Sequence, residues 1–310
     1  MVSRRNLIGT GLWSLAGAGL GGVSLRALPA YAAAAAPVTA EMLTPDVALL
    51  RGAGGNVLAV SDGRKVTLVD GGAQAHTGQL LDAVASAFPG QQITTLFNTH
   101  WHPQQTGANA TLAASGTNII SHANTRLWLT TDVKWPWGGH TMPLPRAAWP
   151  AQVFYNEPLE LGEGAARAVA GYMLQGHTDG DAYVYFPEAD VLHCGGVLAA
   201  DRWPEIDWWT GGWLGGLAEA TETLLAIAND NTRIVAADGP VFGRAELLAQ
   251  RDMYTTLFVK FRDELLFKGL SPEEAVAAQP TREYRPEWGD PGPFVNHAFQ
   301  SLWGYFAPDA

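Results

Sequence analysis

Residues 98–107 read Asn98-Thr99-His100-Trp101-His102-Pro103-Gln104-Gln105-Thr106-Gly107, and this stretch decides how the chain is interpreted. Residues 93–98 before the histidines form a run that predicts a strand. Histidines at the end of a strand lie on a loop that a rigid sheet holds in place. A His-x-His pair in such a loop brings two imidazoles within reach of one ion, so the stretch predicts a metal site.

Composition indicates a globular protein of enzyme size. The chain has 310 residues, of which 47% are hydrophobic and 16% charged, which is enough apolar material for a sizeable core. Its net charge of −11 disfavours nucleic acid and anionic lipid as partners, because both are polyanions. The single cysteine, Cys194, excludes an intrachain disulfide.

The first 32 residues have the pattern of a twin-arginine signal peptide. Ser3-Arg4-Arg5-Asn6-Leu7-Ile8 precedes an apolar run to Leu25, and Ala30-Tyr31-Ala32 offers a small-x-small cleavage site. Glycines interrupt the apolar run, which argues against a stable membrane anchor. We therefore expect the twin-arginine export machinery as a partner, a periplasmic or secreted location, and a mature chain with a net charge of −14 after loss of Arg4, Arg5 and Arg26.

Beyond the signal, the pattern predicts two packed sheets with helices outside, as one domain over residues 33–310. A hairpin is expected at 57–60 and 65–69, and a helix from Thr77, as its cap, to Phe88. Further strands are expected at 93–98, 117–121, 165–172, 182–186, 191–193 and 233–237, and helices at 217–228 and 244–268. A capping box at Ser271 starts another short helix.

Five motifs in order resemble those of the metallo-β-lactamase superfamily. They are His100-x-His102 with Thr106-Gly107-Ala108-Asn109; Val69-Asp70-Gly71-Gly72; Gly176-His177-Thr178-Asp179-Gly180-Asp181; Gly195-Gly196; and Ala237-Asp238-Gly239-Pro240. The resemblance implies an α/β fold, the αββα four-layer sandwich, over residues 33–310. It also implies loops near the metal at 134–150 and 201–216, whose tryptophans either line an aromatic substrate pocket or fix the loops by packing.

The resemblance implies a first metal site made by His100, His102 and His177, all present in this chain. The second metal of the family normally takes Asp, His, a shared Asp and His, where this chain has Gln104, Gln105, Gly196 and Asp238. Two divalent ions close together need anionic ligands to offset their repulsion. We therefore expect one zinc ion per chain.

The replaced positions admit two interpretations each. Gln104, Gln105 and Gly196 either contact substrate in the vacated second metal site or are relics of a decayed one. Asp238 is the candidate general base, or else a carboxylate that closes its loop by hydrogen bonds.

Other residues near the motifs have supporting roles at most. Asp70 and Asp181 match family positions that orient the histidine loops. We expect His193 and Cys194 to be core residues rather than ligands.

These patterns favour an exported hydrolase with a mononuclear three-histidine zinc site that activates water against a small-molecule ester, lactone, amide or thioester. Two alternatives stay open. The first is a non-catalytic binding protein (pseudoenzyme) of the same fold. The second is a three-histidine iron, copper or manganese protein, because neutral imidazoles also bind those metals.

Overall fold

The computed structural model describes residues 37–284 and 286–306. The predicted signal peptide at residues 1–32 lies outside them. Within the described residues, no helix combines the length and the apolar character needed to cross a membrane.

Seven strands of the described chain form the first sheet, and residue order and sheet order nearly coincide. The strands are, in sheet order, β1 (Thr39–Thr44), β2 (Val47–Arg51), β3 (Val57–Ser61), β4 (Lys65–Val69), β5 (Gln92–Asn98), β6 (Asn118–His122) and β9 (Gln152–Phe154). β1 to β4 pair antiparallel, whereas β4, β5, β6 and β9 pair parallel. The carboxyl ends of the parallel strands β4 and β5 therefore meet at one edge.

The second sheet has six strands in the described residues. They are, in sheet order, β10 (Leu159–Leu161), β11 (Ala168–Tyr172), β12 (Ala182–Phe186), β13 (Val191–His193), β14 (Arg233–Val235) and β15 (Val241–Phe242). β13 and β14 pair parallel and the other neighbours antiparallel. A separate short hairpin joins β7 (Val133–Lys134) to β8 (His140–Thr141).

The fold has four layers, a helix layer, two sheets and a second helix layer, so strands of the sheets are buried on both faces. In β2, Val47 and Leu49 point into a core shared with the second sheet, while Ala48 and Leu50 pack toward the helices on the other side. Alternate residues of a strand face opposite sides of the sheet, so every position of this strand can be apolar. The inner core joins the two sheets, and each outer core joins one sheet to its helices.

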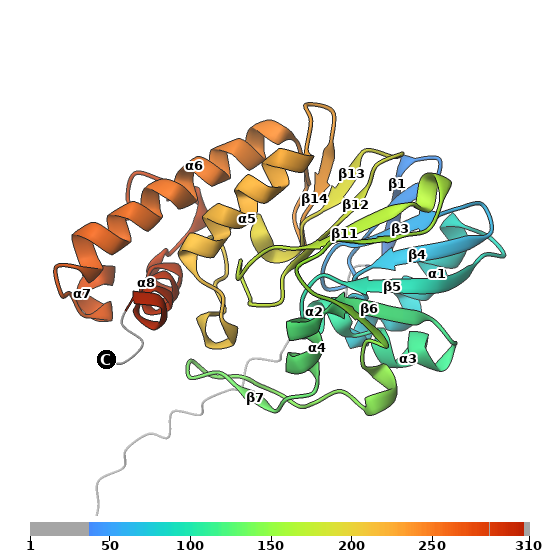
Figure 1. The fold of residues 1–310 in the computed structure, drawn as a ribbon, viewed down its shortest axis with the longest axis horizontal. Coiled ribbons are helices and arrows are strands. Elements are labelled where there is room, and N and C mark those ends of the chain that lie inside the picture. The colour runs from blue at the N-terminus through green and yellow to red at the C-terminus, as the bar shows by residue number, and fades with distance from the viewer. Residues whose placement is uncertain (1–36, 285, 307–310) are drawn as a thin grey trace, which may run out of the picture. The chain divides into compact units, whose positions relative to one another are not determined.

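The helices cover the outer faces of the two sheets (Figure 1). On the first sheet lie α1 (Thr77–Ala87) and α3 (Asn109–Ala114), with α2 (Pro103–Thr106) and α4 (Ala123–Leu129) near its carboxyl edge. On the second sheet lie α5 (Leu214–Ile227), α6 (Arg244–Lys260), the π-helical turn Phe261–Leu266, α7 (Pro272–Ala277) and α8 (Gly292–Phe306). The α/β sandwich expected from the sequence is therefore confirmed.

Most predicted elements are present, with shifted ends. The capping box is confirmed, since Ser271 accepts from the Glu274 N–H and the Glu274 side chain accepts from the Ser271 N–H. Thr77 as a helix cap is wrong. A 3-10 turn, Gln74–His76, runs directly into α1, so the Thr77 N–H already bonds to the Gln74 carbonyl. The predicted helix 244–268 leaves α geometry after Lys260.

One buried histidine gives the fold a specific sensitivity to acid. His122, at the end of β6, stacks on Tyr172 with ring centroids 3.8 Å apart, and its Nδ1 accepts from the Asn124 N–H. Burial lowers the pKa of His122 to about 4, against a small opposing effect of Asp181. The unfolded chain therefore binds a proton at this side chain near pH 6.5, before the folded chain does.

We expect His122 to steepen the loss of stability as the pH falls from about 6.5 to about 4. His122→Asn and His122→Phe both remove the titrating group, and only the first keeps an acceptor for the Asn124 N–H. Each should reduce the slope of unfolding free energy against pH in this window by at most about 1.4 kcal/mol per pH unit. Urea denaturation at several pH values measures it, and an unchanged slope in both variants would contradict the prediction.

Candidate metal centre

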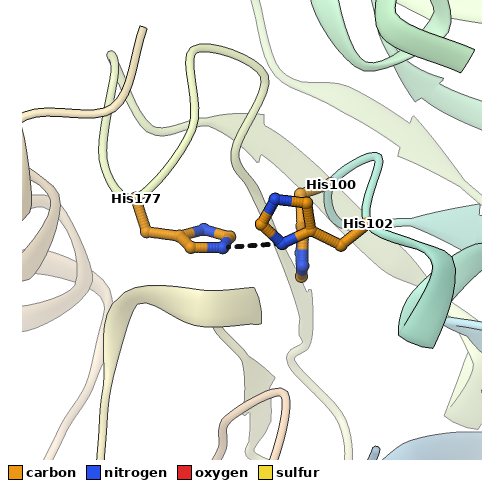
Figure 2. Close-up of side chains that lie close together, drawn as sticks. All are labelled: His100, His102 and His177. Atoms are coloured by element: carbon orange, nitrogen blue, oxygen red, sulfur yellow. Dashed lines mark hydrogen bonds between the residues drawn. The ribbon is translucent and has the colours of Figure 1, made fainter. Parts of the chain in front are cut away.

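Three histidines from two separate loops converge at the carboxyl edge of the sheets. His100 and His102 follow β5, and His177 lies between β11 and β12. Figure 2 shows the His177 ring reaching across to the other two. One nitrogen from each lies within 4.8 Å of the others, and His177 Nε2 is 3.3 Å from His102 Nδ1. All three side chains are buried.

Asp181 orients His177. Its Oδ1 lies 3.0 Å from His177 Nδ1, and its Oδ2 accepts from the backbone N–H groups of His177 and Thr178. A proton on Nδ1 is held by this carboxylate, so the lone pair of Nε2 faces the other histidines. Burial lowers the pKa of His177, but the charge and hydrogen bond of Asp181 outweigh burial and raise it to about 9.

Thr99 and Asp70 orient His100. Thr99 Oγ1 donates to Asp70 Oδ2 at 2.8 Å, and so it can accept from His100 Nδ1 at 2.9 Å. This leaves His100 Nε2 free to face the cluster. Burial, followed by the charges of His177 and His102, holds the pKa of His100 well below its usual value. The supporting roles expected for Asp70 and Asp181 agree with these contacts.

Asp207 orients His102, and sequence reasoning missed it. Its Oδ2 lies 3.0 Å from His102 Nε2 and also accepts from the Trp135 indole N–H at 3.1 Å. Burial acts to raise the pKa of Asp207, but the hydrogen bond and charge of His102 outweigh it and lower the pKa. Asp207 lies in a loop without a metal-ligand motif, so only the fold reveals its role.

The arrangement fits one metal ion. Two nitrogen ligands about 2.05 Å from a tetrahedral zinc ion are about 3.3 Å apart, which is the observed separation of His102 Nδ1 and His177 Nε2. The ring pairs meet nearly edge to face, with interplanar angles of 85–90°. The three rings are thus mutually perpendicular rather than stacked, and one nitrogen of each lies close to those of the other two.

A cavity of about 140 Å³ opens onto the three histidines. Its wall includes each residue predicted at a vacated position: Gln104, Gln105, Gly196 and Asp238. Gln105 is buried, and its side chain acts to raise the pKa of His100 against the larger effect of burial. Asp238, the candidate general base, forms an ion pair with Arg202, which also lines the cavity.

Gly196 lies against the His177 ring. A Cβ placed on this glycine would be 2.5 Å from His177 Cε1 and 2.6 Å from Nδ1. Heavy atoms do not approach so closely, so a side chain at this position and the present position of His177 exclude each other. The glycine is thus part of what positions the third histidine.

The tryptophan-rich segments only partly surround the metal cavity. Trp203 lines it, while Trp135 stacks on Trp101 beside His102 with centroids 5.3 Å apart. Trp137 packs instead on His297 of α8. His193 and Cys194 are fully buried and lie outside the cluster, as expected of core residues.

Comparisons with known proteins identify the family and the fold of the chain. Residues 50–239 match the model of the metallo-beta-lactamase superfamily. A metallo-beta-lactamase from Pontibacter korlensis is 17% identical with a TM-score of 0.56, covering 70% of this chain and 99% of its own. The DIM-1 metallo-beta-lactamase is 15% identical with a TM-score of 0.57, covering 71% and 97%.

A third solved structure covers more of this chain. A double mutant of the sec-alkyl sulfatase PisA1 is 15% identical with a TM-score of 0.66, and the match covers 88% of this chain and 51% of that one. Identities this low show a shared fold alone, and no curated protein matches the chain. Because the superfamily model spans well over half of the residues, and the three-histidine cluster lies where the family's motifs meet, this protein belongs to the metallo-beta-lactamase superfamily.

Proposed function

We propose that the protein is a hydrolase that holds one zinc ion through His100, His102 and His177 and cleaves a small-molecule ester, lactone, amide or thioester. The observation that carries this proposal is the support of each ring. The second nitrogen of every histidine is hydrogen-bonded to an oxygen of the chain, namely that of Thr99, Asp207 or Asp181. Oriented imidazoles of this kind are typical of functional metal sites.

Zinc bound by three histidines supplies Lewis acidity and lowers the pKa of water to about 7. The chain's own residues would position the reactants around it. Gln104 and Gln105 offer amide groups that can donate to a carbonyl or accept from a hydroxyl group. Asp238 lines the same cavity and is our candidate proton acceptor, provided that substrate binding separates it from Arg202.

Three features support one ion rather than two. Gln104 and Gln105 are uncharged, so they do not offset the repulsion between two cations. Gly196 has no side chain to bridge them, and the His177 ring fills the space that one would need. Asp238 already has a cationic partner in Arg202.

The purified protein should contain one equivalent of zinc, and His177→Ala should lose both the metal and hydrolysis. Elemental analysis by emission spectroscopy measures the metal, and His76→Ala, at a partly exposed histidine before α1 and outside the cluster, is the matched control. One equivalent of iron, copper or manganese in place of zinc would favour the alternative of a three-histidine iron, copper or manganese protein. Protein that is folded and binds ligands equally well without metal would favour the non-catalytic binding protein.

Gly196→Ala should weaken zinc binding about 10- to 100-fold, the usual cost of disturbing the support of a ligand, because its Cβ must displace the His177 ring. Gly196→Asp should not create a second zinc site, because its Cβ meets the same His177 ring. Gly78→Ala, where an added Cβ meets nothing within 4 Å, is the control for the substitution itself. Competition with a chromophoric chelator measures the affinity. Two zinc ions per chain in Gly196→Asp would refute the steric argument.

We also propose export by the twin-arginine pathway to the periplasm or the medium, on the strength of Arg4-Arg5 and the apolar run that follows. Replacing both arginines by lysine should retain the precursor in the cytoplasm, because the pathway reads the arginine pair. Cell fractionation and immunoblotting measure the distribution. Undiminished export of the Lys-Lys variant would contradict the assignment.

A further inference from the structure

A second cavity, of about 280 Å³, lies on the other side of the loop that carries His100 and His102. Its wall is mainly apolar and comes from α2, α3, α4 and the segment after the β7–β8 hairpin. The apolar side chains that matter most are those of Trp101, Trp128, Leu129, Met142, Leu144 and Pro145.

The indole groups present carbon rather than polar atoms to this cavity. The Trp101 N–H donates to Thr210 Oγ1 at 3.1 Å, and the Trp128 N–H donates to Asp179 Oδ1 at 2.6 Å. Both donors are thus satisfied away from the cavity. Met142 is 63% exposed, and a flexible thioether at a rim suits contact with apolar ligands of varied shape.

The second cavity adjoins the metal centre. Gln104 lines both cavities. Trp101, which forms part of the apolar wall, lies between the two histidines in sequence, and its ring centroid is 4.9 Å from that of His102. A molecule that passes over Gln104 would therefore contact the histidine cluster at one end and the apolar wall at the other.

We propose that this cavity binds the apolar chain or ring of the substrate, while the bond to be cleaved lies at the histidine cluster. The inference rests on the proposed function for the reaction, but the cavity's preference for apolar ligands stands on its own lining. An apolar cavity beside the metal centre narrows the proposed substrate to an ester, lactone, amide or thioester with a medium-length alkyl or aromatic substituent. Gln104, at the junction, would contact the polar group next to that substituent.

Two variants on α3 distinguish filling of the cavity from a general effect of adding a bulky side chain to this helix. Ala110 is exposed and lines the cavity, and Ala114, one helical turn later, is exposed and does not line it. Ala110→Phe should fill the cavity, and Ala114→Phe should leave it open. Neither residue belongs to the histidine cluster.

Binding of 1-hexanol, 1-octanol and 1-decanol, followed by calorimetry and tryptophan fluorescence, tests the cavity without any reaction. Affinity should rise at most about fourfold per added methylene in the unsubstituted protein and in Ala114→Phe. It should fall at least about tenfold for decanol in Ala110→Phe. Equal decanol binding by the unsubstituted protein and Ala110→Phe, or none by either, would overturn the inference.

Hydrolysis of p-nitrophenyl esters from acetate to decanoate separates the two proposals. We expect kcat/KM to rise with chain length in the unsubstituted protein and in Ala114→Phe, and Ala110→Phe to abolish the rise. Cleavage that is indifferent to chain length would overturn the inference alone. Decanol binding that Ala110→Phe abolishes, with no ester, lactone, amide or thioester of these acyl chains cleaved by zinc-loaded protein, would support the apolar site and overturn the hydrolase.

Discussion

The geometry of the metal site depends on three hydrogen bonds. Each bond holds the ring nitrogen of one histidine that does not face the cluster. Thr99, Asp207 and Asp181 come from three different loops, and each holds one imidazole so that its other nitrogen faces the same point. Burial makes these contacts strong, because water does not compete for them. The donors around Asp181 and Asp207 offset the cost of burying these carboxylates. At Asp70, burial outweighs the hydrogen bonds from Thr99 and raises the pKa of the carboxyl group to about 8.

The sandwich is what allows distant segments to supply these groups. Two sheets packed face to face bring the loops after β4, β5, β11 and β13 to one edge, although more than a hundred residues of chain separate the first from the last. The inner core combines small and branched side chains, such as Val60 and Ala170, with the buried rings of Phe97, Phe154 and Phe186. Rigid packing of this kind lets loops with little regular structure hold a defined geometry.

The sequence predicts most where one local rule decides. The hairpin around residues 61–64, strand β5 and the cap at Ser271 follow from short patterns, and the three histidines follow from motif spacing. β2 was not predicted because burial on both faces removes the alternation that marks a strand. Asp207 was missed for another reason: its role arises from a contact with His102, which lies 105 positions away in the sequence. The residues that hydrogen-bond to a metal-ligating histidine are set by the tertiary structure rather than by a local sequence pattern.

The buried state of Cys194 has a consequence for handling and maturation. The side chain is fully enclosed, and burial raises the pKa of its thiol, so the reactive thiolate is scarce. With no second sulfhydryl in the sequence to pair with, the covalent framework is the same in reducing and oxidising surroundings. The chain can therefore reach its folded form on either side of a cell membrane without an oxidant or a disulfide isomerase.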